Sequence, residues 1–215
     1  MNDIPDQHLD IPAHAPVMVL PQAVLFPSSH LPLFIFEPRY RAMLAWSLER
    51  ERMFCIALLR EGLNDWHSPA DFHHVAGLGL VRACVGREDG TSHLILQGLT
   101  RVTFTAFDET QPFVLATLRA LPSTEPDPAS APALVVKVRE LCAEYRAKGA
   151  EVPEALVAQL AAVEDAGVLA DIVAHTFVQD AARRQQLLET TNVTERLRML
   201  LGDLREVLGE KDEKD

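Results

Sequence analysis

The sequence contains no hydrophobic run of the roughly twenty residues that a helix needs to cross a bilayer. Its N-terminus, MNDIPDQHLDIP, also lacks the basic flank and the apolar segment of a secretory signal. We therefore predict a cytoplasmic protein that neither spans nor inserts into a membrane.

Cysteine is scarce, and its spacing matches no known site. The three cysteines, Cys55, Cys84 and Cys142, lie in apolar stretches and form no C-x-x-C pair. We interpret them as reduced, buried side chains, because structural zinc sites place their ligands in fixed pairs.

Basic residues are outnumbered by acidic ones. The net charge is -11, and neither the first 120 residues nor the remainder is basic. Proteins that bind nucleic acids gain affinity from clustered Lys and Arg. The charge therefore disfavours a nucleic-acid partner, including RNA.

The sequence also lacks the short motifs of common enzymes. It contains no G-x-x-x-x-G-K-[ST] phosphate loop, no G-x-G-x-x-G after a strand, no G-x-S-x-G elbow and no H-E-x-x-H. We therefore expect no ATP hydrolysis, no catalytic residue, no bound metal and no cofactor.

Hydrophobic periodicity predicts a sheet with one helix in the first 120 residues. Short apolar runs at 17–20 and 31–36 are typical of buried strands, while 53–59 is apolar on both faces and predicts a central strand. Residues 24–26, between prolines, are expected to form a loop that points into the core. From Tyr40 the spacing changes to three and four, which predicts a helix with Pro38 in its first turn.

Further strands are predicted downstream, in a mostly antiparallel arrangement that curls into a partial barrel. They occupy residues 75–85, 92–97, 100–107 and 113–121. Gly77 and Gly79 are expected at a bulge or where another backbone approaches closely.

Four prolines in residues 122–132 predict an extended linker, and helical periodicity follows it. Gly149 is expected to end one helix and Gly167 to interrupt another. Asp180 and Asn192 are predicted helix caps. The fold class is thus α+β, with a small antiparallel β pseudo-barrel before a helical bundle. The predicted divisions are a leader at 1–15, a β-rich domain at 16–121, the linker at 122–132, a helical domain at 133–209 and a charged tail at 210–215.

Several motifs resemble the amino-terminal, substrate-binding domain of Lon proteases. They are L-P-x-x-x-L-F-P at 20–27, L-P-L-x-I-F-E-P-R-Y at 31–40, V-A-G-L-G at 75–79 and L-Q-G-L-T-R at 96–101, and the similarity spans roughly residues 16 to 208. The resemblance implies a PUA-like pseudo-barrel and a role in substrate recognition. It covers only the recognition part of a Lon protease, without the ATPase and peptidase domains that follow in full-length members.

We therefore interpret the chain as a non-catalytic module that binds unfolded or partner polypeptides. Four aromatic residues are the predicted contacts: Trp66, Phe72, Phe26 and Phe36. Trp66 and Phe72 lie on the polar stretch 60–74, where they either tuck back against the body or wait for a partner.

An alternative is a small metal-dependent or other hydrolase centred on the loop 60–74. This loop carries His67, His73 and His74 together with two aspartates, but not at the spacing of a zinc motif. Elsewhere, Asp171 and His175 lie four residues apart on a predicted helix. We interpret them as a polar edge that ties this helix to the helix of Arg196, in preference to an acid/base pair.

Overall fold

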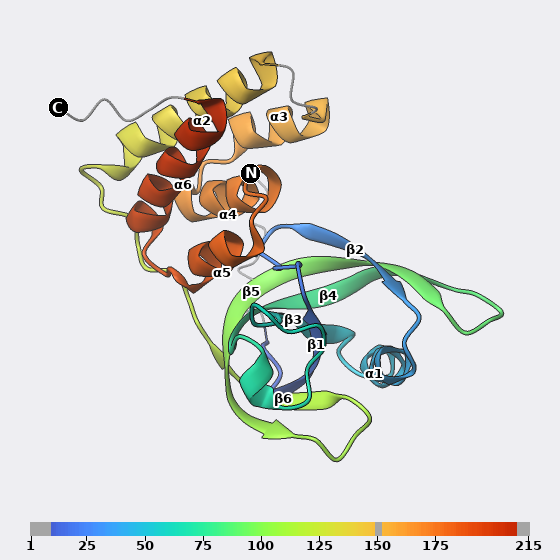
Figure 1. The fold of residues 1–215 in the computed structure, drawn as a ribbon. Coiled ribbons are helices and arrows are strands. Elements are labelled where there is room, and N and C mark those ends of the chain that lie inside the picture. The colour runs from blue at the N-terminus through green and yellow to red at the C-terminus, as the bar shows by residue number, and fades with distance from the viewer. Residues whose placement is uncertain (1–9, 149–151, 210–215) are drawn as a thin grey trace, which may run out of the picture.

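The computed structural model describes residues 10–148 and 152–209, and these form an α+β fold in which helices stack on one end of a small barrel (Figure 1). The elements are β1 (His14–Leu20), β2 (His30–Ile35), α1 (Pro38–Leu48), β3 (Met53–Leu58), the short 3-10 helix η1 (Pro69–Asp71), β4 (Val75–Gly86), β5 (Ser92–Asp108), β6 (Val114–Ala120), α2 (Ala131–Ala147), α3 (Glu154–Ala162), α4 (Ala166–Phe177), α5 (Ala181–Glu189) and α6 (Val193–Leu208).

The six strands form a sheet in the order β2-β5-β4-β3-β1-β6, and β6 also pairs with β5. This second pairing closes β5, β4, β3, β1 and β6 into a ring, and β2 remains outside the ring on β5. The β1–β3 pair is parallel and every other pair is antiparallel. The predicted pseudo-barrel is confirmed.

β5 is a single long strand that pairs with three others, β2, β4 and β6. Its first half pairs with β2, and its second half pairs with β6. The prediction of two separate strands at 92–97 and 100–107 is therefore wrong. Gly98 lies inside the strand and does not end it, because the ladder to β4 continues on both sides of it.

The loop between β1 and β2 packs tightly against β4 and β5. Phe26 and its neighbour Leu25 are fully buried, as expected for a loop that points into the core. The Ser28 amide donates to the Gly98 carbonyl at 2.9 Å, and the Gly98 amide donates to a carbonyl of the loop at 2.8 Å. A Cβ on Gly98 would lie 1.9 Å from the Phe26 oxygen, and one on Gly77 would lie 2.0 Å from the Leu25 oxygen. The close backbone approach predicted at Gly77 is confirmed.

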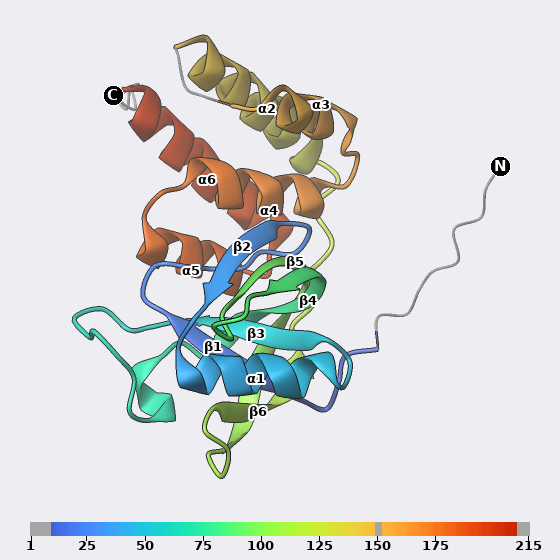
Figure 2. The same ribbon diagram turned by 90° about the vertical axis from the view of Figure 1, so that its right-hand side faces the viewer.

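Helix α1 covers one face of the sheet, where it packs against β1 and β3 (Figure 2). Tyr40, Met43 and Leu44 form its buried side, as their spacing predicts. The Tyr40 hydroxyl donates to the Val19 carbonyl at 2.9 Å, which satisfies a polar group inside this core. β3 pairs with both β1 and β4 and is buried on both faces, which confirms that it is central.

The helices α2 to α6 enclose a second core that also receives side chains from the barrel. Phe26, Val24 and Leu58 belong to the same buried cluster as the helices. The two parts of the chain are thus joined by shared apolar packing.

The predicted helix ends are confirmed in part. The side chain of Asp180 accepts the Arg183 amide at 2.7 Å, and that of Asn192 accepts an amide at 3.0 Å, so both are N-caps. Gly167 does not interrupt a helix but lies in the first turn of α4, which is capped by Asp165. The expected end at Gly149 falls outside the described residues.

The proline-rich linker lies against the start of α6 and is hydrogen-bonded to it. The Thr124 amide donates to the Thr191 carbonyl at 3.0 Å, and the Asp127 amide donates to the Thr194 hydroxyl at 2.9 Å. Helix α2 begins at Ala131, inside the predicted linker range.

His14 and Ala15, which fall in the predicted leader, belong to β1 and pair with β6. No helix in the described ranges is long and apolar enough to cross a membrane.

Candidate binding surfaces

Three large apolar side chains are exposed together near the outer edge of the sheet. Phe34 is 43% exposed, Phe36 57% and Val85 67%. Phe34 and Val85 line a shallow groove of about 400 Å³, together with residues of β2, β4 and β5. We call Phe34, Phe36 and Val85 the Phe34 patch.

Ring contacts hold the patch in place. The rings of Phe34 and Phe36 stack with centroids 5.7 Å apart, and Phe34 also stacks on His93 at 4.6 Å. The Arg87 guanidinium lies 5.8 Å from the Phe34 ring. Among the described strands β2 pairs only with β5, so its other edge faces outward. Pro32 lies in this edge strand, where its missing N–H is tolerated.

The aromatic residues predicted as contacts lie in different environments. Phe26 and Phe72 are fully buried, so the expectation that they are available at the surface is wrong. Phe26 fills the junction core, and Phe72 packs edge-to-face on two phenylalanines of β5. Trp66 is half-buried, and its indole N–H donates to the Tyr40 hydroxyl at 3.2 Å. Only Phe36 is largely exposed, and it belongs to the Phe34 patch.

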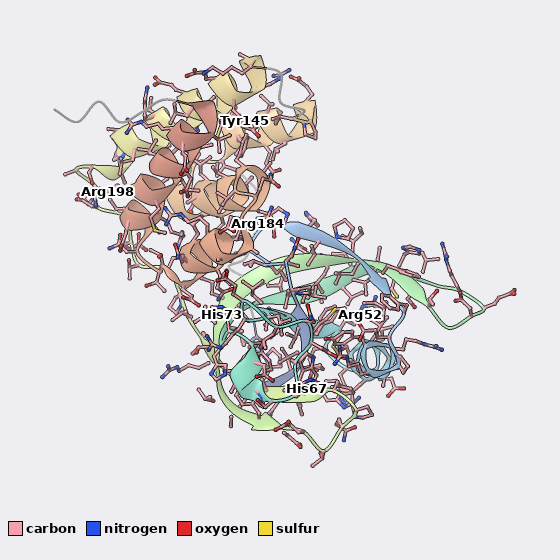
Figure 3. The ribbon with its side chains drawn as sticks, in the orientation of Figure 1. Arg52, His67, His73, Tyr145, Arg184 and Arg198 are labelled. Atoms are coloured by element: carbon pink, nitrogen blue, oxygen red, sulfur yellow. The ribbon has the colours of Figure 1, made fainter. Side chains whose placement is uncertain are left out.

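The histidines of the loop 60–74 have separate partners. His73 Nδ1 lies 3.1 Å from Oε1 of Glu189 on α5, and His74 Nε2 lies 2.8 Å from the Pro69 carbonyl oxygen. Figure 3 shows His67 well apart from His73. Within the described residues no three His, Cys, Asp or Glu side chains are grouped so that they could hold a metal ion.

A polar pocket of about 330 Å³ lies at the junction of the two parts. Its walls come from β5, the linker and the first turns of α4 and α6, and they include Arg101, Ser123, Asp165, Gly167 and Asp171. We call it the junction pocket.

A buried charge cluster lies along this pocket. Arg101 and Asp171 are each 3% exposed and form a bidentate ion pair, with one N–H···O distance of 2.9 Å. Arg196 is fully buried, and its Nε lies 3.4 Å from Asp171 Oδ1. Burial lowers the pKa of Arg196 to about 10, which still leaves it charged at neutral pH. The expectation that Asp171 ties its helix to that of Arg196 is confirmed.

His175 lies one turn after Asp171 on α4 and is a half-buried titratable group. Its Nδ1 has no hydrogen-bond partner. Burial lowers the pKa of His175, and the nearby Arg184 guanidinium lowers it further. Figure 3 shows Arg184 where the helices meet the start of β2, and His30 of that strand also faces His175.

We expect acid to destabilise the protein through His175. A lowered folded-state pKa means that the unfolded chain binds a proton first, so stability is complete above a pH of about 6.5 and falls as pH drops toward the folded-state pKa. The His175→Phe variant should show a shallower loss of unfolding free energy over this range, measured by urea titration at several pH values. An unchanged pH dependence in this variant would contradict the assignment.

Residues 14–206 match the sequence model of the ATP-dependent protease La (LON) substrate-binding domain. The chain belongs to this Lon domain family. The match begins at the first residue of β1 and ends within α6, so it covers both the barrel and the helices.

Individual Lon proteases show the same similarity. The chain is 31% identical over 189 residues to Lon protease 2 of Herpetosiphon aurantiacus and 25% identical over 199 residues to the Lon protease of Desulfosudis oleivorans. These alignments cover 86% and 92% of this chain but only 23% and 24% of the relatives. The chain therefore spans about a quarter of the length of these Lon proteases.

Solved structures confirm the Lon-domain fold. The N-terminal domain of the Mycobacterium avium complex Lon protease superposes with a TM-score of 0.72 at 19% identity, covering 90% of this chain and 98% of that one. The Lon N-terminal domain protein from Xanthomonas campestris has a TM-score of 0.62 at 17% identity, covering 88% and 97%. At sequence identities of 19% and 17%, the structural similarity establishes the fold alone.

Proposed function

We propose that this Lon-family domain binds unfolded polypeptide at the Phe34 patch and catalyses no reaction itself. The observation that carries the proposal is the exposure of Phe34, Phe36 and Val85 side by side on one edge of the sheet. Exposed apolar groups that gather in one place are typical of interaction sites. The description of the matched family as a substrate-binding domain supports the same role.

The geometry of the patch suits an extended chain. The groove is lined by residues of strands β2, β4 and β5, and an extended segment places alternate side chains on one face. The outer edge of β2 offers backbone groups to such a segment, as in recognition by strand addition. Pro32 removes one donor from that strand, so apolar contact with the two phenylalanines and Val85 should supply most of the affinity.

Substitutions in the patch should weaken binding. We expect Val85→Ser and Phe34→Ala each to raise the Kd for a fluorescently labelled, permanently unfolded polypeptide by about tenfold, which corresponds to about 1.4 kcal/mol of lost apolar contact. Fluorescence anisotropy would measure the Kd. The matched control is Val136→Ser, because Val136 is 54% exposed but lies on α2.

The control should bind as tightly as the unmodified protein. Equal affinity of the Val85→Ser and Val136→Ser variants for the unfolded polypeptide would show that the Phe34 patch is not part of the binding site. If the unmodified chain bound no unfolded polypeptide at all, the proposed function itself would be wrong.

A further inference from the structure

An apolar pocket lies among the helices α2, α3 and α4, in the part of the molecule farthest from the barrel (Figures 1 and 2). Its volume is about 240 Å³. The most deeply buried part of its lining comes from α4, through Leu169, Val173 and Phe177, which are each at most 3% exposed. The rest comes from α2, through Cys142 and Ala143 among others, and from α3 and the residue before it. We call it the α3 pocket.

Two arginines of α2 line the α3 pocket and bridge to α3. Arg139 Nε donates to the Leu160 carbonyl at 3.1 Å and its Nη2 donates to the Val163 carbonyl, both at the end of α3. Arg146 Nη2 lies 2.6 Å from Oε2 of Glu154, the first residue of α3. The arginines are seven residues apart, which corresponds to about 10 Å along a helix. The other pocket residues of α2 lie between them in sequence, so a bridge stands on each side of the pocket.

The lining offers a ligand very few polar partners. Both guanidinium groups already donate to atoms of α3. The other described residues of the lining are apolar apart from Cys142, and burial raises the pKa of its thiol to about 12, so the thiol stays uncharged. A bound water needs roughly two to four polar partners, and this pocket does not supply them. The α3 pocket therefore suits a molecule that carries no charge.

The size of the pocket limits its occupant to one small molecule. An apolar cavity of about 150 Å³ in another protein binds benzene. The α3 pocket is larger, at about 240 Å³, so it has room for one or two rings. An extended polypeptide would have to leave the pocket on both sides, where the bridges of Arg139 and Arg146 stand. A discrete small molecule needs no such exit.

We propose that the α3 pocket binds a small, uncharged aromatic molecule of one or two rings. Its ring would pack on the α4 side chains, where Phe177 offers an aromatic partner. Aromatic pairs are favoured beyond the apolar area that they bury. The site lies among the helices and the Phe34 patch lies on the sheet, so the inference does not depend on polypeptide binding at that patch.

Toluene is a suitable probe, because 4-methylpyridine has the same shape with one polar ring nitrogen. We expect toluene to bind saturably with a Kd of about 1 mM or lower. At a pH where it is uncharged, 4-methylpyridine should bind at least about tenfold more weakly, because its nitrogen would lose its hydrogen bond to water. Methyl NMR spectra measure both affinities. The Val157, Leu160 and Val173 methyl groups should shift with toluene, whereas those of Val207, exposed on α6, should not.

Filling the pocket should weaken binding without unfolding the protein. We expect Ala143→Leu to lower the affinity for toluene by at least about tenfold, because the larger side chain would extend into the pocket. Ala143 is exposed on α2 and leucine is a strong helix former, so the fold should tolerate the change. The matched control is Ala147→Leu, because Ala147 is exposed one turn further along the same helix and lies outside the lining.

Three further results would overturn the proposal. They are equal binding of toluene and 4-methylpyridine, no shift of the pocket methyl groups at saturating toluene, and undiminished binding in a folded Ala143→Leu variant. The NMR shifts need no variant, so they test the site even if the substitution prevents folding.

Two other occupants can be distinguished in the same assay. Tighter binding of 4-methylbenzoate than of toluene would mean that Arg139 or Arg146 recruits an anion, which contradicts an uncharged ligand. Displacement of toluene by an unfolded polypeptide would mean that the pocket receives side chains of a bound chain, which contradicts a free small molecule. Failure of the polypeptide to bind at all would leave the toluene result unchanged.

Discussion

Replacing Gly98 with alanine should lower the free energy of unfolding by at least about 3 kcal/mol, the upper end of the usual cost of overpacking. The added carbon would lie 1.9 Å from the Phe26 carbonyl oxygen, which is a backbone atom. Relief would require the β1–β2 loop to move away from β5, breaking its two hydrogen bonds to Gly98 and displacing the buried Phe26. Urea denaturation followed by circular dichroism measures the loss.

The control for Gly98→Ala is Gly202→Ala, in the exposed middle of α6, where an added Cβ would have nothing within 4 Å. Alanine is favoured over glycine in a helix by about 0.5–1 kcal/mol, so this variant should be slightly more stable than the unmodified protein. A Gly98→Ala variant as stable as Gly202→Ala would mean that the loop does not lie against β5 in solution.

Replacing Asp171 with alanine should cost about 3–5 kcal/mol of stability, because two buried guanidinium groups would lose the carboxylate with which both form ion pairs. The cost comes from the uncompensated charges of Arg101 and Arg196 more than from the lost ion pair. Chemical denaturation near neutral pH would measure it.

Two further variants separate these contributions. Replacing Arg101, Asp171 and Arg196 together by apolar residues of similar size should restore most of the stability, because no buried charge then remains. Removing the exposed Arg146–Glu154 pair through Arg146→Ala should change stability by less than about 1 kcal/mol. A loss for Asp171→Ala as small as that for Arg146→Ala would show that the arginines reach water.

Local periodicity predicted much of the fold. The three-and-four spacing after Tyr40 located α1, and the two-sided apolar run 53–59 located the central strand β3. These predictions succeed because burial repeats with the period of the element itself. The family resemblance supplied the barrel and the helical part, and the matched sequence model confirms it.

Features set by contacts distant in sequence were harder to predict. Gly98 suggested a break between strands, yet it keeps its place in β5 because the β1–β2 loop crosses there. Gly167 suggested an interruption, yet helix α4 starts one residue earlier under the cap of Asp165. In both cases the role of the glycine depends on a neighbouring chain segment, and no local sequence pattern identifies that segment.

The binding surfaces were only partly visible in the sequence. Phe36 is among the predicted contacts, but the exposure of Phe34 and Val85 is not predicted, because the edge position of β2 depends on the pairing of all six strands. Phe26 and Phe72 are also predicted contacts, but both are core residues. Arg101 ends the 96–101 motif, but no local pattern links it to its partner Asp171, which is 70 residues away.

The buried side chains of the β1–β2 loop have a mechanical consequence. Because Phe26 is anchored among the helices while Gly98 holds the same loop to β5, the barrel and the helices should unfold in one cooperative transition. A protease that nicked the chain near Pro126 would leave two fragments that stay associated. A pulling force on a polypeptide bound at the proposed Phe34 patch would therefore pass from the barrel to the helices, because the two parts share one packed core.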